Sequence, residues 1–233
     1  MTGRLPHLCH VFPSFAPGGP EMRTVTIMNA LRASVRHTVI PLDGRADAAS
    51  AVSAGVTIDV RQPPAGKGRY TYARALAPVL EAIAPDLLLT YNWAGVDGVV
   101  AAIGLPVPVI HGEDGFGPEE AERLKWRRVL TRRLALRRAD AVVVPSHTLE
   151  AIARRRYGVP DARLKRISNG VDTDRFHPRR DVAWRRVQGI ADSDVVFGYV
   201  GALRAEKQLD VLIRCVAALQ RADVWLVLVG DGP

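Results

Sequence analysis

The chain has 233 residues, of which 48% are hydrophobic and 24% are charged, with 20 glycines and 16 prolines. This composition is typical of a globular protein and excludes the disordered, fibrous and low-complexity classes. The 32 basic and 24 acidic residues give a net charge of +8, which favours anionic partners such as phosphorylated small molecules, an acidic membrane surface or nucleic acid. Arginine-rich coding from a GC-rich genome would give the same charge without any function.

Two features of the sequence concern its compartment. Its two cysteines, Cys9 and Cys215, lie far apart, which argues against a disulfide framework and fits a reducing compartment. The first residues hold no long apolar run, so we expect no signal peptide. The weakly charged stretch 87–110 is long enough to span a bilayer, but Asn92 and Asp97 favour a strand, a loop, a helix and a strand. We therefore expect a cytoplasmic protein.

Short apolar segments alternate with helical patterns along the first 168 residues. Pro20 suits the first turn of a helix, Ser146 is a candidate N-cap and Gly158 a helix end. This alternation predicts an α/β fold with a parallel, doubly wound sheet. The expected strands are residues 7–12, 37–42, 56–60, 87–91, 107–111, 141–144 and 164–168, and the expected helices are residues 20–31, 72–84, 119–138 and 147–157.

The pattern then starts again in a second, shorter half. Gly170 and Pro178 mark a turn and an expected domain boundary, with domains at 1–178 and 179–233. The second half holds one β-α-β unit, which leaves a sheet face and an edge uncovered. We therefore expect a complete first Rossmann-like domain and only the start of a second one. The unit consists of a strand at 195–200, a helix carrying Leu209, Leu212, Ile213, Val216 and Leu219, and a strand at 224–229.

A first glycine loop, Gly18-Gly19-Pro20-Glu21, lies between a strand and the start of a helix. Glycines there let backbone N–H groups approach an anion, which the helix dipole also favours. The loop is not the GxGxxG fingerprint, so an oxidoreductase that binds a dinucleotide is disfavoured. Tight glycine turns are common, and Glu21 also fits as a complement to the helix dipole.

His111 stands at the end of a predicted strand, where ligands bind in open α/β sheets. A histidine there can hydrogen-bond a sugar hydroxyl or a phosphate, although a loop histidine bonded to backbone is the plainer interpretation. Glu113 and Asp114 have no partner at metal-ligand spacing, and the other five histidines form no cluster in the sequence. We therefore expect no metal site.

The predicted helix from Glu119 to Arg138 carries eight basic residues with Trp126, Leu130 and Leu134 interleaved. It fits an amphipathic helix that lies on anionic lipid headgroups. A packed helix with a solvated basic face fits somewhat better. Nucleic acid is disfavoured as a partner, because no nucleic-acid-binding motif accompanies the charge.

A second glycine loop begins at Gly201 and adds two cations, Arg204 and Lys207, before a predicted helix. Both side chains supply donors to phosphate oxygens, so they are candidates for a diphosphate clamp. Lys207 also fits as an exposed helix lysine without a ligand.

Together these segments resemble family 4 retaining glycosyltransferases of the GT-B fold. The most specific segment is ISNGVDTDRFHP, residues 167–178, which is similar to the end of the family's N-terminal domain. The segments that carry the resemblance are GGPE at 18–21, His111-Gly112, RADAVVVPSHTLEAIARRRYGVP at 138–160, ISNGVDTDRFHP, GALRAEKQLDVLI at 201–213 and the terminal LVGDGP.

The resemblance implies transfer of a sugar from a nucleotide-diphosphate donor to an acceptor, with retention, no metal and no further cofactor. It implies that Lys207 contacts the donor phosphates, that Gly19 borders them and that His111 lies near the transferred sugar. The first half would hold the acceptor, of the cell-envelope, polysaccharide or glycolipid type. A lipid-linked acceptor would suit a protein that contacts the inner face of the membrane through its basic helix.

Two departures from the family pattern affect these expectations. Ala202 stands where the family usually has arginine, and Arg204 is a candidate to replace it. The family's Glu-x7-Glu pair, which holds the donor's sugar and ribose, has no counterpart. We therefore expect a C-terminally truncated chain that is inactive or nearly so by itself. The alternative function is a non-catalytic module that binds anions or a membrane.

Overall fold

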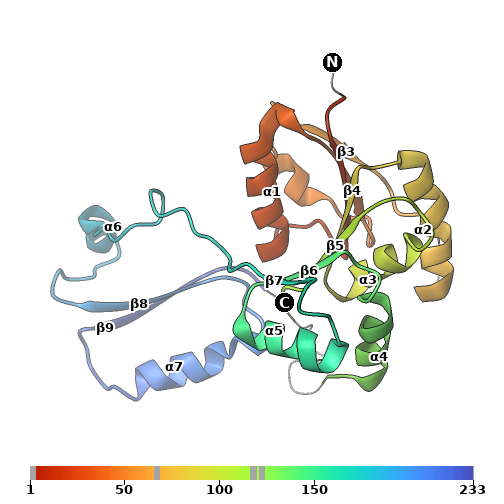
Figure 1. The fold of residues 1–233 in the computed structure, drawn as a ribbon. Coiled ribbons are helices and arrows are strands. Elements are labelled where there is room, and N and C mark those ends of the chain that lie inside the picture. The colour runs from red at the N-terminus through yellow and green to blue at the C-terminus, as the bar shows by residue number, and fades with distance from the viewer. Residues whose placement is uncertain (1–3, 66–68, 116–119, 121–123, 233) are drawn as a thin grey trace. The chain divides into compact units, whose positions relative to one another are not determined.

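The computed structural model describes residues 4–65, 69–115, 120 and 124–232. The chain separates into two compact units, Met1–Asn169 and Gly170–Pro233, which are described one at a time (Figure 1). Within the described ranges, no helix combines the length and the apolar character that crossing a membrane requires.

A seven-stranded sheet forms the centre of the first unit, and every neighbouring pair of strands is parallel. The strand order is β3-β2-β1-β4-β5-β6-β7, so the order reverses between β1 and β4. Ligands of such sheets bind beyond the carboxyl ends of the strands. The strands are β1 His7–Phe12, β2 Arg36–Pro41, β3 Thr57–Val60, β4 Leu87–Tyr91, β5 Val109–Gly112, β6 Ala141–Val144 and β7 Leu164–Arg166.

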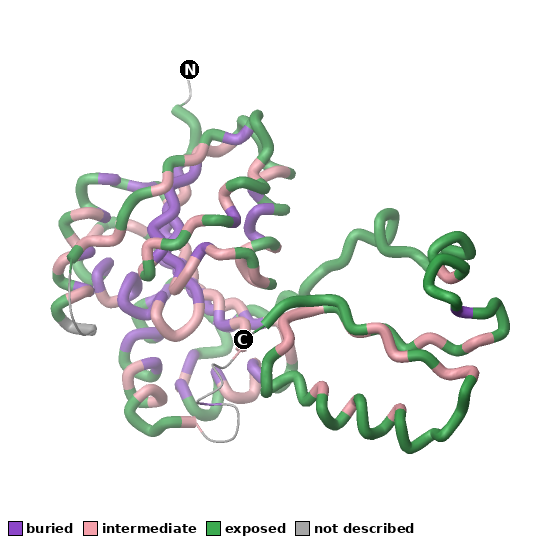
Figure 2. The backbone as a smooth tube through the Cα atoms, turned by 180° about the vertical axis from the view of Figure 1, so that it is seen from behind, coloured by how far each residue is buried: buried purple, intermediate pink, exposed green. Residues whose placement is uncertain are grey.

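Helices cover both faces of this sheet, as a buried parallel sheet requires. One face packs against α2 Arg69–Ile83, α3 Asn92–Ala101, α4 Trp126–Ala135 and α5 His147–Ile152, which continues as a π-helical turn at Ala153–Tyr157. The other face packs against α1 Gly19–Leu31 and the short turn Asp47–Ala51. The strands between these layers are the most deeply buried part of the unit (Figure 2).

The structure confirms the predicted parallel α/β fold and most of the predicted elements of the first unit. Ser146 caps α5 as expected, because its Oγ accepts a hydrogen bond from the Leu149 N–H over 3.2 Å. Gly158 ends the π-helical turn in the left-handed conformation, at φ 66°. These two residues mark the start and the end of the helical segment that links β6 to β7.

The predicted helix at 119–138 is shorter in the structure. Residues 116–119 and 121–123 of this region lie outside the described part, Leu124 and Lys125 are not helical, and α4 ends at Ala135. A physical reason is visible at its start: the Glu120 carboxylate accepts the Lys125 N–H over 3.3 Å and pairs with Arg128. A carboxylate that binds a free N–H at this point favours a new helix N-terminus.

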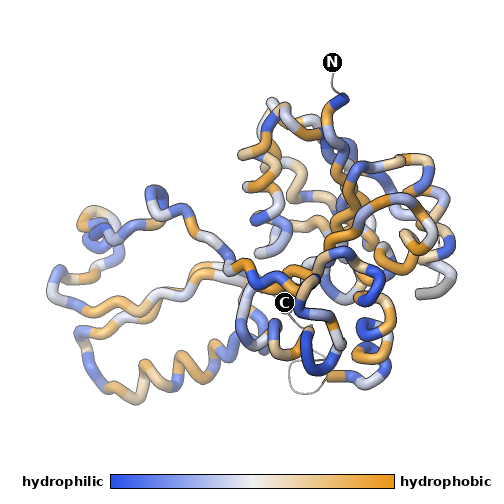
Figure 3. The backbone as a smooth tube through the Cα atoms, in the orientation of Figure 1, coloured by the Kyte–Doolittle hydropathy of each residue, from blue (hydrophilic) through white to orange (hydrophobic). Residues whose placement is uncertain are grey.

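The second unit pairs β8 Val195–Val200 with β9 Val224–Val229 in parallel and joins them through α7 Leu209–Ala217. This is the predicted β-α-β unit. A short helix that was not predicted, α6 Val182–Val187, precedes it. The Asp181 side chain caps this helix by accepting the Trp184 N–H. Apolar residues recur along the strands and α7 of this unit (Figure 3), and many of their side chains are exposed. They include Phe197, Val200, Val211, Ile213, Leu228 and Val229.

Two glycines let α3 lie close against the sheet of the first unit. A Cβ on Gly98 would stand 2.8 Å from Thr90 Cγ2, and one on Gly95 would stand 3.2 Å from the Val11 carbonyl oxygen. The close approach places the start of α3 beside the ends of β4 and β5.

We predict that Gly98→Val destabilises the first unit by about 2 kcal/mol or more, because the added methyl groups would overpack β4 and β1. Urea unfolding measures this change. Gly55→Ala is the control, since a Cβ at Gly55 would meet open space. Equal unfolding midpoints for the two variants would contradict the predicted close packing.

Candidate functional site

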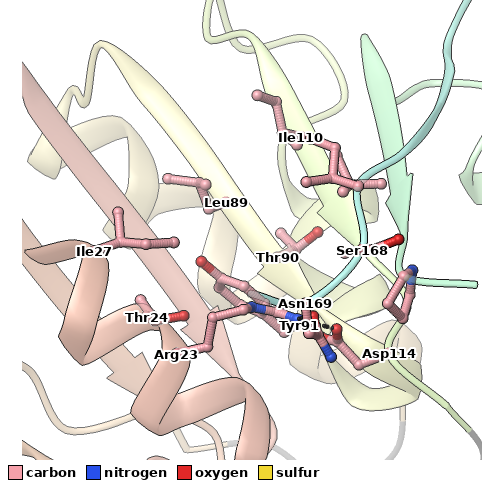
Figure 4. A pocket seen from close by; sticks show the side chains of 14 residues that line it. Arg23, Thr24, Ile27, Leu89, Thr90, Tyr91, Ile110, Asp114, Ser168 and Asn169 are labelled. Carbon is pink, nitrogen blue, oxygen red and sulfur yellow. Dashed lines mark hydrogen bonds and ion pairs between the residues drawn. The ribbon is translucent and has the colours of Figure 1, made fainter. Parts of the chain in front are cut away.

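A pocket of about 290 Å³ lies at the carboxyl ends of the central strands, on the face of the sheet that α1 covers. Apolar side chains from α1 and the strands form most of its wall, and polar groups gather at one end (Figure 4). The lining residues are Arg23, Thr24, Ile27, Leu89, Thr90, Tyr91, Ile110, Gly112, Asp114, Val143, Pro145, Ile167, Ser168 and Asn169.

Arg23 holds the polar end of the pocket together. Its guanidinium donates to both oxygens of Asp114, over 2.6 and 2.9 Å, and to Oδ1 of Asn169 over 2.6 Å. The hydrogen bond to Asp114 raises the pKa of Arg23 further above its ordinary value. A two-pronged pair of this kind fixes orientation as well as charge. It ties α1 to the loop after β5 and to the chain that follows β7.

Asn92 fixes the same loop from the other side. Its Oδ1 accepts the backbone N–H of Asp114 over 2.8 Å. Asn92 is the first residue of α3 and has a left-handed backbone, at φ 54°, a conformation that asparagine tolerates better than most residues. No functional role of Arg23, Asn92 or Asn169 was predicted from the sequence. The position of Asn92 directly after a strand is the one local signal.

The predicted anion loop at the start of α1 is partly filled by its own side chain. A Cβ on Gly18 would stand 2.5 Å from Glu21 Oε2, so the Glu21 carboxylate lies over this glycine. Burial raises the pKa of Glu21. Gly19 borders open space, and Gly18 is extended, at φ −157°. The binding roles of Gly18, Gly19 and Glu21 stay predictions.

His111 is fully buried beneath the pocket. Its Nδ1 lies 2.8 Å from Thr90 Oγ1, and its Nε2 lies 3.4 Å from Glu113 Oε2. The neighbouring Gly112, rather than the His111 ring, lines the pocket. Both ring nitrogens have partners within the protein, and the catalytic role of His111 stays a prediction.

Glu113 carries a buried charge that Arg132 of α4 neutralises. Arg132 Nε and Nη2 each donate to one Glu113 oxygen over 3.0 Å, and Arg132 Nη1 lies 3.3 Å from Glu120 Oε2. Burial by itself raises the pKa of Glu113, but His111 and Arg132 outweigh it and the net shift is downward. Arg132 also lies over the rings of Trp93 and Tyr157, at 4.8 and 5.2 Å.

The histidines of β1 and β2 meet under α1, a contact that was not predicted from the sequence. His10 Nε2 lies 3.1 Å from His37 Nδ1, and His10 Nδ1 lies 3.1 Å from the Tyr91 hydroxyl at the pocket. Burial, with smaller contributions from His37 and His7, lowers the pKa of His10 to about 3. The sequence hides this contact because it depends on the register of two neighbouring strands.

In the second unit, Arg204 and Lys207 are exposed and lie at a short turn before α7. Arg204 precedes the turn Ala205–Lys207, and Gln208 follows it in the left-handed conformation, at φ 52°. The predicted layout of a strand, Gly201, two cations and a helix start is therefore present. Their contact with phosphate stays a prediction.

We predict that Arg132→Met lowers the free energy of unfolding by about 3 kcal/mol or more, because it leaves the buried Glu113 carboxylate without its guanidinium partner. Arg133→Met is the matched control: the same substitution one residue along α4, at an exposed position, should change stability by about 0.5 kcal/mol or less. Urea titrations followed by circular dichroism compare the two. Similar losses in both variants would contradict the role of the buried pair.

We also predict that the free energy of unfolding falls as the pH drops from 6.5 to 5. His10 binds protons more weakly in the folded chain than in the unfolded one, so the unfolded state gains protons first in this window. Where His10 is protonated in the unfolded state only, the free energy of unfolding changes by about 1.4 kcal/mol per pH unit. His10→Gln should make the free energy of unfolding depend less steeply on pH. The same substitution at the exposed His147 should leave the pH dependence unchanged. A profile unchanged by His10→Gln would refute the prediction.

Comparisons with known proteins identify relatives of this chain. The family model Glycosyltransferase Family 4 matches residues 17–175. The D-inositol 3-phosphate glycosyltransferase of Nocardiopsis dassonvillei is 32% identical over 208 residues, which cover 77% of this chain and 47% of that protein. The GDP-mannose-dependent alpha-(1-6)-phosphatidylinositol monomannoside mannosyltransferase of Mycolicibacterium smegmatis is 36% identical over 149 residues, covering 60% and 38%.

The fold is also shared with solved structures. The crystal structure of Anabaena HepE in complex with UDP has a TM-score of 0.76 at 21% identity, over 97% of this chain and 61% of that one. This likeness confirms the predicted α/β fold of the GT-B type. The chain spans less than half the length of the curated relatives named above. Because the family model matches well over half of its residues, the chain belongs to Glycosyltransferase Family 4.

Proposed function

We propose that this protein takes part in transferring a sugar from a nucleotide-diphosphate donor to an acceptor, with retention at the anomeric carbon. The family match over residues 17–175 carries the proposal. Relatives named as glycosyltransferases and as GDP-mannose-dependent mannosyltransferases, and a similar fold solved with UDP, support a nucleotide-sugar donor. The nucleotide sugar is a substrate, and the proposed reaction uses no further cofactor and no metal.

The proposed donor contacts are Arg204 and Lys207. Negative charge gathers on the diphosphate as the bond to the sugar breaks, and fixed cations stabilise that charge. Both side chains are exposed and precede α7, which begins at Leu209 and whose dipole also favours an anion at its start. Arg204 would replace the arginine that the family pattern places at Ala202.

The proposed acceptor site is the pocket of the first unit. Asp114 and Asn169 offer oxygen and nitrogen atoms to a hydroxylated acceptor, and Arg23 keeps them in place. The wall formed by Ile27 and Leu89, with other strand residues, is apolar. This combination fits a saccharide or glycolipid that presents one polar end and one apolar surface.

This chain by itself is expected to be inactive or nearly so, because it holds no counterpart of the family's Glu-x7-Glu pair. The alternative function is a non-catalytic module that binds anions or a membrane. Robust sugar transfer by the purified chain would contradict the expected inactivity. Binding to lipid without any affinity for nucleotide diphosphates would favour the module.

We predict that the chain binds UDP or GDP more tightly than the matching monophosphate, and that Arg204→Ser combined with Lys207→Ser weakens the diphosphate binding at least tenfold. Two charge-assisted hydrogen bonds of about 1.5 kcal/mol or more would be lost. Saturation-transfer NMR with UDP, GDP, UMP and GMP measures the affinities.

The control for this double variant is Arg179→Ser with Arg186→Ser, which removes the same charge from exposed positions in the same unit. It should keep diphosphate affinity within about twofold, because exposed charges act weakly at a distance in salt. Equal losses in both double variants would show a diffuse charge effect and contradict the proposed clamp.

A further inference from the structure

The outer face of α4 carries an apolar stripe made of Trp126, Leu130 and Leu134. These side chains are 69%, 47% and 62% exposed. At about 100° per residue, their spacing of four places them within an arc of about 80°. Three large apolar groups side by side on one exposed face are more than the scattered surface hydrophobes of an ordinary globular protein.

Arginines border this stripe on both sides. By the same helical geometry, Arg133 lies along one edge of the stripe and Arg127 along the other, and Arg137 and Arg138 directly follow the end of α4. All four side chains are exposed. The guanidinium of Arg127 lies 5.4 Å from the Trp126 ring. Residues 124–138 contain no aspartate or glutamate, so nothing within this segment balances the outward charge.

The opposite face of α4 is fixed to the rest of the first unit. Arg132 pairs with Glu113 and Glu120, and Arg128 pairs with Glu120 and lies over the Trp93 ring at 4.9 Å. The rotation of the helix about its axis is therefore set by buried contacts. A rigid helix holds the stripe outward, and the stripe cannot turn inward without breaking the buried pairs.

We propose that this outer face of α4 binds the surface of an anionic lipid bilayer. Tryptophan and leucine side chains enter the headgroup boundary, and arginines beside them contact lipid phosphates. Charge complementarity selects this occupant, because an exposed apolar stripe with arginines on both sides matches a bilayer surface, which has an apolar interior and anionic headgroups. The proposal does not depend on sugar transfer by the chain, and it names which arginines of the predicted basic helix can reach lipid.

The test is co-sedimentation of the 233-residue chain with vesicles of phosphatidylcholine, either alone or mixed with phosphatidylglycerol. We expect binding to the mixed vesicles and much weaker binding to phosphatidylcholine alone. Trp126→Ser combined with Leu130→Ser and Leu134→Ser should lower the partition coefficient at least tenfold. Each of Arg127→Ser, Arg133→Ser and Arg137→Ser should lower it about fivefold, since a cation at such a surface contributes about 1 kcal/mol.

The matched control removes three exposed arginines elsewhere, by Arg175→Ser, Arg179→Ser and Arg186→Ser, and should keep most of the binding. Circular dichroism establishes that each variant is folded, which is expected because every substituted side chain is exposed. Two results would overturn the proposal. One is equal vesicle binding by the stripe variant and the native chain. The other is a native chain that ignores vesicles but self-associates through the stripe, shown by a smaller species for the stripe variant in sedimentation velocity.

Discussion

A single buried carboxylate, that of Glu113, sets the arrangement around the candidate pocket. It follows directly after β5, almost wholly out of water, and a charge in that position is tolerated only with a fixed partner. Arg132 supplies that partner from α4, and Glu120 with the rings of Trp93 and Tyr157 surrounds the guanidinium. Segments far apart in the chain are thereby held to the carboxyl end of one strand.

The next residue, Asp114, extends this constraint to the other side of the sheet. Neighbouring residues of an extended chain point to opposite faces, so fixing Glu113 toward α4 directs Asp114 toward α1. There it meets Arg23, which also binds Asn169 beyond β7. Two consecutive carboxylates thus connect the helical layers on both faces of the sheet. The position of the pocket follows from this, because its polar end is the second of the two ion pairs.

The fold could be predicted largely from the sequence because its signals are local. Apolar runs such as residues 87–91 and 141–144 mark buried strands, and Ser146 and Gly158 mark the ends of one helical segment. The pocket could not be predicted in the same way. Arg23 and Asp114 are 91 residues apart, and nothing near either residue in the sequence indicates the other. Contacts of this kind depend on strand order and register.

The basic helix shows that the direction of a charged side chain is also hard to predict from the sequence. In sequence, Arg132 and Arg133 are indistinguishable neighbours, yet one is wholly buried and paired while the other is exposed. The count of basic residues therefore overstates the charge that this region presents to a partner and leaves its direction open.

Once the inner arginines are matched with Glu113 and Glu120, the unbalanced charge of α4 lies on its outer face alone, around the apolar stripe. One helix thus has two separable tasks. Its inner face keeps the end of β5 in place, and its outer face is free to meet another surface without disturbing the pocket. If lipid binds there, the pocket is held near the bilayer by the same helix that shapes it, and a lipid-linked acceptor would need no separate membrane anchor to reach it.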